Sequence, residues 1–469
     1  MTQVIDTPPS LPADAAEEEV KHAGPLVHLN EFQILMRRWS GLHPYNAGQV
    51  MEVSGPPDRA RWKHAVEAVI RDLGLGKPRF TGGEFAVQFI PVAEIAIEQA
   101  EGGLEAFFSE ELNRPFAAGD LPIRFCILPA PSKGEHGAGS HYLAAVYDHW
   151  IADSRAMREL MHRIYDRYRA GEGGATLPPL TLVAAPFEKL FRKHISLLPR
   201  AQAMRESLKN IWRHRNGFRL NLRNPLDFAT GFAMRELPDG LIQRLHAFAR
   251  QQKASVNDLF IALIGQSLGA YTAPERLKKS KKPMHFARRK LGIGTIVDIR
   301  DAAAEPLDCV FNLYLSSFTV LLESPEKRPA DELTRAVAAE TSRVKKSLAA
   351  VRGFFALAAA RFWYDVYDSP RFRASLLHKT VPVVAGISNV NMTGSWADPN
   401  GNAAAPGDEP RVLDYIRISP VGPLIPVVFT LTTIGGRLTL CVTYRKTTFK
   451  GERLGALVDD LAKRLEAVA

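Results

Sequence analysis

Cysteine is scarce in this chain of 469 residues, and the three present, Cys126, Cys309 and Cys441, lie far apart. They form no C-x-x-C pair, which argues against a disulfide framework and against a cysteine-based zinc site. Each has apolar neighbours in the sequence. We therefore expect three buried, reduced thiols in a cytoplasmic protein.

Long apolar runs are also missing, because the best candidate for a membrane span, residues 354–360, is followed at once by Arg361. The N-terminus has acids and prolines where a secretion signal needs basic and apolar residues. No Walker loop, dinucleotide-binding glycine fingerprint or H-E-x-x-H motif is present. We expect no membrane span, no metal and no tightly bound cofactor.

Positive charge is in excess, since 60 Lys and Arg stand against 50 Asp and Glu, a formal net charge of +10. This surplus favours an anionic partner. The strongest basic cluster, residues 276–290, is either a solvated loop or an anion site for a CoA phosphate or an acidic carrier-protein helix. Phe286 is its only aromatic residue, so we do not expect nucleic-acid binding. The candidate docking residues are Lys278, Lys279, Lys281, Lys282, Arg288 and Arg289.

The order of the predicted elements indicates a mixed α/β (α+β) protein in two halves, without the strict βαβ alternation of a Rossmann sheet. Residues 1–24 read as a disordered arm. Glycine and proline gather in residues 172–186, which places a boundary between an N-terminal half, 25–185, and a C-terminal half, 186–469.

A strand, a histidine, an aspartate and a helix follow one another in residues 141–171. Residues 141–147 are apolar enough for a buried strand, and apolar residues recur at helical spacing from Ala156 onward. We expect Ser154 to cap that helix. His149, at the end of the strand, is well placed to act as a general base. Asp153 lies where the chain turns into the helix, which suits a residue that holds the turn. From the H-x-x-x-D spacing alone, a hydrogen-bonded core histidine is equally consistent.

Further motifs occur in a fixed order along the chain. They are LNRPF at 112–116, LPIR at 121–124, DHWIADS at 148–154, SVND at 255–258, VDIR at 297–300 and SNV at 388–390. From about Pro25 onward the chain resembles the superfamily of CoA-dependent acyltransferases. This superfamily includes chloramphenicol acetyltransferase, plant H-x-x-x-D-G acyltransferases, wax ester synthases and the condensation domains of nonribosomal peptide synthetases.

The resemblance implies two chloramphenicol acetyltransferase-like half-domains that form a V-shaped pseudo-dimer around a central tunnel. The donor would be a thioester, acyl-CoA or carrier-protein bound, and the acceptor a small hydroxyl or amine compound of natural-product biosynthesis. His149 would be the general base, and Asp153 a structural residue paired with Arg300. Ser388, Asn389, Ser154 or nearby backbone N–H groups would stabilise the oxyanion or position the substrate. We expect a free-standing monomer.

The sequence departs from the family motif at two positions that flank the His149–Asp153 pair. Asp148 replaces the first histidine of H-H-x-x-x-D-G and precedes Trp150 in the chain, and Ser154 replaces its glycine. A serine side chain there would narrow the tunnel or supply a new hydrogen bond. No D-F-G-W-G motif is found near Tyr415. These departures keep open an alternative, a catalytically degenerate condensation-like module that docks a carrier protein or a partner enzyme.

A second enzyme hypothesis comes from Gly265-Gln-Ser267-Leu-Gly269, which matches G-x-S-x-G. A hydrolase nucleophile elbow needs a strand before the serine and a helix after it. The preceding Ser255-Val-Asn-Asp258 reads as a capping box, which favours one continuous helix through Ser267 instead.

Overall fold

The computed structural model describes most of the chain. The described residues are 24–83, 85–131, 139–171, 177–182, 185–195, 205, 209, 212–214, 217–220, 224, 226–277, 288–346, 354–367, 369–373, 382–392 and 410–469.

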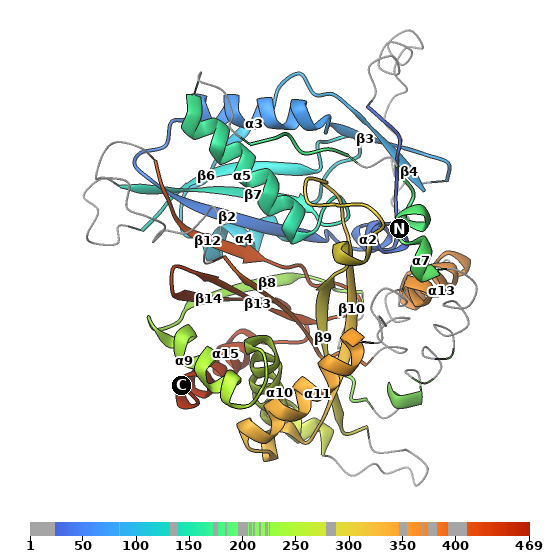
Figure 1. Ribbon diagram of the computed structural model, residues 1–469, viewed down its shortest axis with the longest axis vertical. Helices are drawn as coiled ribbons and strands as arrows, with labels where there is room; N and C mark the ends of the chain where they lie inside the picture. Colours follow the sequence, from blue (N-terminus) through green and yellow to red (C-terminus); the bar gives the residue numbers. More distant parts are fainter. Residues whose placement is uncertain are drawn as a thin grey trace.

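The described strands form three sheets (Figure 1). The three-stranded sheet has the order β1-β4-β3, the five-stranded sheet β12-β2-β7-β6-β5, and the six-stranded sheet β10-β9-β11-β13-β14-β8. The strands are β1 (Val27–His28), β2 (Asn46–Ser54), β3 (Lys77–Thr81), β4 (Ala86–Ile90), β5 (Ile97–Gln99), β6 (Ile123–Pro129), β7 (Ser140–Asp148), β8 (Thr230–Glu236), β9 (Lys290–Asp298), β10 (Leu315–Glu323), β11 (Ala385–Asn391), β12 (Val412–Ile418), β13 (Val427–Ile434) and β14 (Arg437–Arg445).

Helices cover the outer faces of the two larger sheets, α3 and α5 on the five-stranded sheet and α9, α10, α11 and α15 on the six-stranded one (Figure 1). The helices are α2 (Glu31–Ser40), α3 (Arg59–Leu73), α4 (Leu104–Glu111), α5 (Ser154–Ala170), α6 (Phe187–Leu190), α7 (Arg192–Ile195), α9 (Leu241–Gln251), α10 (Val256–Arg276), α11 (Ala330–Lys346), α13 (Phe354–Val366) and α15 (Gly451–Ala467), with 3-10 turns η2 (Arg300–Ala302) and η3 (Pro325–Lys327). This is the mixed α/β architecture that the sequence predicts.

Strand β7 is covered on both faces, and residues 141–147 are all buried. This explains their nearly continuous apolar sequence, since a strand buried on both sides needs no polar alternation. β7 lies between β2 and β6, antiparallel to both. Its last residue, Asp148, is opposite Asn46 on β2. β7 is therefore the central strand of the five-stranded sheet, and His149 directly follows its last residue.

Strand β12 comes from late in the chain yet belongs to the five-stranded sheet, where it pairs antiparallel with β2. In this register Arg417 lies opposite Gln49, and Ile416 opposite Val50. A hydrophobic cluster between the two larger sheets joins Phe108 of α4 to Phe232 of β8, with ring centroids 5.5 Å apart. Residues from the second half of the chain thereby reach the sheet that carries His149.

Three sequence expectations need correction. Cys309 is exposed, whereas Cys126 and Cys441 are buried as predicted; its apolar neighbours Val310 and Phe311 are buried, but the turn carries the thiol outward. The cap of α5 is Asp153 rather than Ser154, which is already the first helical residue. The apolar sequence from Phe311 to Leu322 predicts one strand, but the strand begins only at Leu315.

The described residues contain no helix that is both long and apolar enough to cross a membrane. Among these same residues, no group of His, Cys, Asp and Glu side chains could hold a metal ion.

Candidate active site

His149 lies in the short turn between β7 and α5. Its backbone N–H donates to the carbonyl of Tyr45 at 3.1 Å. Its Nδ1 is 3.0 Å from the carbonyl oxygen of Ala152. A carbonyl can only accept, so Nδ1 must carry the proton, and Nε2 then holds the lone pair that a general base needs.

The surroundings of His149 keep the imidazole neutral. Burial lowers its pKa below 6.5, because the charged form loses its hydration, and the Ala152 hydrogen bond opposes this only in part. The ring stacks on Tyr45 and meets Tyr147 edge-on, with centroids 5.8 Å away in both cases. The side chain is therefore fixed in orientation and able to accept a proton at neutral pH.

Asp153 uses both carboxylate oxygens to hold the turn. Oδ1 accepts from the backbone N–H groups of Arg155 and Ala156, at 3.0 and 2.9 Å, as the N-cap of α5. Oδ2 accepts from the backbone N–H of Tyr314 at 2.8 Å and lies 2.8 Å from Nη1 of Arg300. Asp153 is fully buried, so these contacts give it a structural task and leave it no free face for proton transfer.

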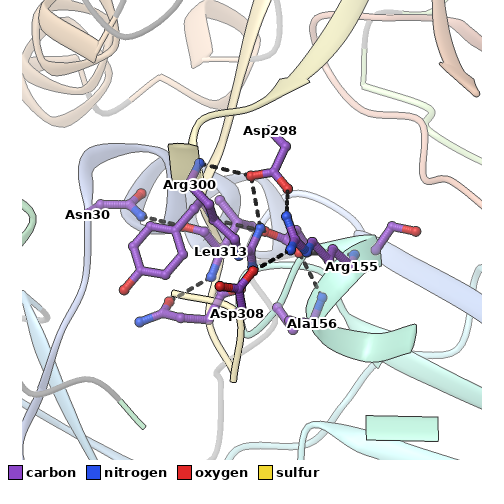
Figure 2. A network of polar contacts seen from close by, with 12 residues as sticks. Asn30, Arg155, Ala156, Asp298, Arg300, Asp308 and Leu313 are labelled. Atoms are coloured by element: carbon purple, nitrogen blue, oxygen red, sulfur yellow. Dashed lines mark hydrogen bonds and ion pairs between the residues drawn. The ribbon is translucent and has the colours of Figure 1, made fainter. Parts of the chain in front are cut away.

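The expected ion pair between Asp153 and Arg300 is thus present, and it belongs to a larger network. Arg300 follows β9 and also contacts Oδ1 of Asp298 through Nη1, at 3.2 Å. Figure 2 shows Arg155 reaching both Asp298 and Asp308, at 3.0 and 2.7 Å. The start of α5 is therefore bound to the end of β9 by paired charges.

A cavity of about 810 Å³ opens beside this turn, and His149 lines it. Its wall comes from both parts of the chain, with α2, β2 and α5 on one side and β9, β10, β11 and β12 on the other. The candidate oxyanion and positioning residues Ser388, Asn389 and Ser154 all border it. The structure therefore brings these three predicted residues together with the candidate base around one space.

The two residues next to His149 in the chain turn away from the cavity. Oδ1 of Asp148 accepts a 2.7 Å hydrogen bond from the Ser40 hydroxyl, and burial raises its pKa to about 6. Trp150 is buried against Phe80, with centroids 5.4 Å apart. Neither borders the cavity, so neither side chain is placed to contact a substrate there.

The predicted docking cluster can be placed only in part. Lys278, Lys279, Lys281 and Lys282 lie outside the described residues. Arg288 and Arg289 are exposed and do not border the cavity.

Ser267 is buried well inside α10, far from either end of the helix. The capping box at Ser255 and Asp258 is present, as predicted. The strand-to-helix turn that a nucleophile elbow requires is absent at this serine, which rules out the hydrolase hypothesis.

Sequence reasoning missed Arg417. This arginine of β12 borders the cavity and is 2% exposed. Its Nη1 donates to the hydroxyl of Ser154 at 2.9 Å and to that of Ser388 at 3.3 Å. The signal in the sequence is a lone arginine in the largely apolar strand VLDYIRI, which contains Tyr415.

Ser154 therefore supplies a hydrogen bond that glycine could not. Its hydroxyl accepts from Arg417 and, at 3.3 Å, from Nε2 of Gln49, which also donates to the Ser154 carbonyl at 2.9 Å. The serine that replaces the motif glycine is therefore hydrogen-bonded to Arg417 of β12.

No protein-family model matches the sequence, and no curated protein does. Solved structures do match the fold. The condensation domain from the monacolin K polyketide synthase MokA is 13% identical, with a TM-score of 0.64, over 95% of this chain and 97% of that one. The TRI3 trichothecene 15-O-acetyltransferase from Fusarium sporotrichioides is 10% identical (TM-score 0.65; 94% of each chain). The X-domain in complex with OxyB from teicoplanin biosynthesis is 17% identical (TM-score 0.57; 94% and 93%).

At these identities the likeness establishes the fold. The chain has the two-lobed fold of condensation domains and of this acetyltransferase, which is the fold that the sequence motifs predict.

Proposed function

We propose that the protein is an acyltransferase that moves an acyl group from a thioester, acyl-CoA or carrier-protein bound, to a hydroxyl or amine acceptor in natural-product biosynthesis. The observation that carries the proposal is the state of His149. Its Nδ1 proton is fixed on the Ala152 carbonyl, and its neutral ring borders an open cavity. The condensation-domain fold supports the same reaction class.

The reaction follows from that geometry. Nε2 of His149 takes the proton of the acceptor as its oxygen or nitrogen attacks the thioester carbonyl. The tetrahedral intermediate carries a negative oxygen, for which the Ser388 hydroxyl or the Asn389 side chain is a candidate donor, as are backbone N–H groups near Ser154. When the intermediate collapses, the carbon–sulfur bond breaks and the imidazolium returns its proton to the leaving thiolate. Asp153 and Arg300 keep the turn in place throughout.

Thiol release from a panel of acyl-CoA thioesters, measured with hydroxyl and amine acceptors, tests the proposal. We expect His149→Ala to lower the transfer rate by about 10²–10⁴, the usual contribution of a general base. His162→Ala is the matched control, because His162 lies on α5 but does not border the cavity. Transfer that is unaffected by His149→Ala would overturn the assignment of the base.

The docking alternative is favoured by one observation, the likeness to an X-domain solved in complex with OxyB. A module without chemistry has no need for an open cavity at His149, and here such a cavity exists. Transfer activity that depends on His149 would eliminate this alternative.

A further inference from the structure

Arg417 is a buried cation whose hydrogen-bond partners among the described residues are all neutral. Besides the two serine hydroxyls, its Nη2 donates to the carbonyls of Ser388 and Leu431, at 3.4 and 3.2 Å. Its Nε is buried and, among the described residues, has no partner. No carboxylate of the described residues forms an ion pair with Arg417. A buried charge without a counter-charge is costly to fold around, so its retention points to an anion that arrives from outside.

A second arginine of the cavity wall also forms no ion pair with a described residue. Arg158 of α5 is half-buried, borders the same cavity and, within the described ranges, forms no ion pair. Burial, together with the nearby positive charge of Arg158, lowers the pKa of Arg417 to about 10. Arg417 therefore stays cationic at neutral pH.

The acids of the cavity wall do not neutralise these two arginines, because each is already paired elsewhere. The pairs are Glu159 with Arg163, Asp298 with Arg155 and Arg300, and Glu340 with Arg213 and Arg343. Arg158 and Arg417 therefore give this part of the wall a surplus of positive charge.

The two serine hydroxyls add hydrogen-bond donors beside this positive charge. The hydroxyls of Ser154 and Ser388 both accept from Arg417, so each has its own proton left to donate in another direction. Both side chains border the cavity. A carboxylate accepts several hydrogen bonds at once and matches such a set of donors. Apolar side chains of the wall include Phe32, Leu35, Met36 and Trp39 from α2.

We propose that Arg417 and Arg158, with the hydroxyls of Ser154 and Ser388, bind the carboxylate of an organic-acid substrate whose apolar body lies along α2. The proposal rests on the proposed function in that the acid is one of its two substrates, either the acceptor or the acyl chain of the donor. Ser154 directly follows Asp153, so the carboxylate site adjoins the turn that carries His149.

Equilibrium binding to the purified full chain tests this without any need for turnover. Isothermal titration near neutral pH compares hydrocinnamate and octanoate with their neutral amides. We expect at least one acid to bind about tenfold or more tightly than its amide, the effect of a charge-assisted hydrogen bond. His149→Ala should keep this preference while it lowers the transfer rate by about 10²–10⁴, which separates failure of the site from failure of the proposed reaction. If neither acid binds better than its amide, the proposal is overturned.

Single-residue variants show which side chains cause the preference for the acid over its amide. Arg417→Gln should abolish it, and Arg417→Lys, which keeps the charge but not the fork of donors, should retain part of it. Arg158→Gln should weaken it and tests the site even if Arg417→Gln does not fold, because Arg158 is only half-buried. Arg343→Gln is the matched control, since Arg343 also borders the cavity but pairs with Glu340. An equal loss in this control would overturn the proposal.

A second pair of probes distinguishes the two sources of the carboxylate. If it belongs to the acyl chain, glutaryl-CoA should bind more tightly than butyryl-CoA, and Arg417→Lys should reduce the difference. If it belongs to the acceptor, the two thioesters should bind alike, and free hydrocinnamate should bind alongside butyryl-CoA. If neither comparison shows a preference for the negatively charged compound, the proposal is contradicted.

Discussion

Oδ2 of Asp153 lies 2.8 Å from Nη1 of Arg300, and both side chains are almost completely removed from solvent, 0% and 4% exposed. The pair joins the N-terminus of α5 to the end of β9, two elements from different halves of the chain. Because the other oxygen of Asp153 caps α5, one carboxylate fixes both the helix and the inter-lobe contact that frame the turn of His149.

We expect Asp153→Ala and Arg300→Met each to lower the free energy of unfolding by about 3–5 kcal/mol, because each strands a buried charge. Urea denaturation measures this loss. Asp308→Asn is the control, since the Arg155–Asp308 pair is more exposed and should contribute less than about 1 kcal/mol. An Asp153→Ala protein with unchanged stability and no transfer would instead indicate a chemical role for this carboxylate.

The pH dependence of transfer should report the lowered pKa of His149. At pH 6.5 an ordinary histidine is half protonated, whereas here the neutral, basic form predominates. The acidic limb of kcat/KM should therefore have its midpoint below pH 6.5 in the wild-type protein. Since the unfolded chain binds the proton more tightly, the same shift makes folding less stable as the pH falls through this window. A midpoint above 6.5 would contradict the described environment of the ring.

Asp148 should make stability depend on pH in the opposite sense. Burial raises its pKa from 3.8 to about 6, so between these values the folded state binds more protons than the unfolded state. The free energy of unfolding then falls as the pH rises through this window and stays lower above it. Asp148→Asn keeps an oxygen that can accept from Ser40 but carries no charge. Its stability relative to wild type should increase from pH 4 to pH 7, as measured by urea denaturation at both; a constant difference would argue against a buried, titrating Asp148.

Much of the fold was predictable because the signals are local. The strand before His149 and the helix from Ser154 follow from the length and periodicity of their apolar residues, and their bounds agree with the structure to within one residue. Strands β3 and β5 were missed, because Lys77–Thr81 is polar and Ile97–Gln99 has only three residues. Periodicity is weak in both.

The site was predictable only where its residues belong to a motif. His149, Asp153 and Arg300 stand in such motifs, but the contact of Arg417 with Ser154 depends on the crossing of β12 to β2. Nothing in the local sequence around Ser154 indicates which distant strand will face it. That no described acid pairs with Arg417 is likewise a property of the assembled wall, so it becomes visible only in three dimensions.

Restoring the motif glycine, by Ser154→Gly, should separate the two roles open to the serine. It removes the hydroxyl that contacts Arg417, while Gln49 keeps its 2.9 Å hydrogen bond to the backbone carbonyl of residue 154, so the turn should persist. If the hydroxyl helps to bind a substrate carboxylate, KM for that substrate should rise about three- to tenfold at nearly constant kcat, because the ground state and the transition state lose the same contact.

Steady-state kinetics with the acid substrate make that measurement, and Ser388→Ala removes the matching hydroxyl contact from β11. If Ser388 donates to the oxyanion, its variant should lower kcat and kcat/KM together, since that contact forms only in the transition state. The same pattern for Ser154→Gly would make Ser154 the oxyanion donor. A gain of activity in Ser154→Gly would show that the serine obstructs the cavity, and would contradict a role for its hydroxyl in substrate binding.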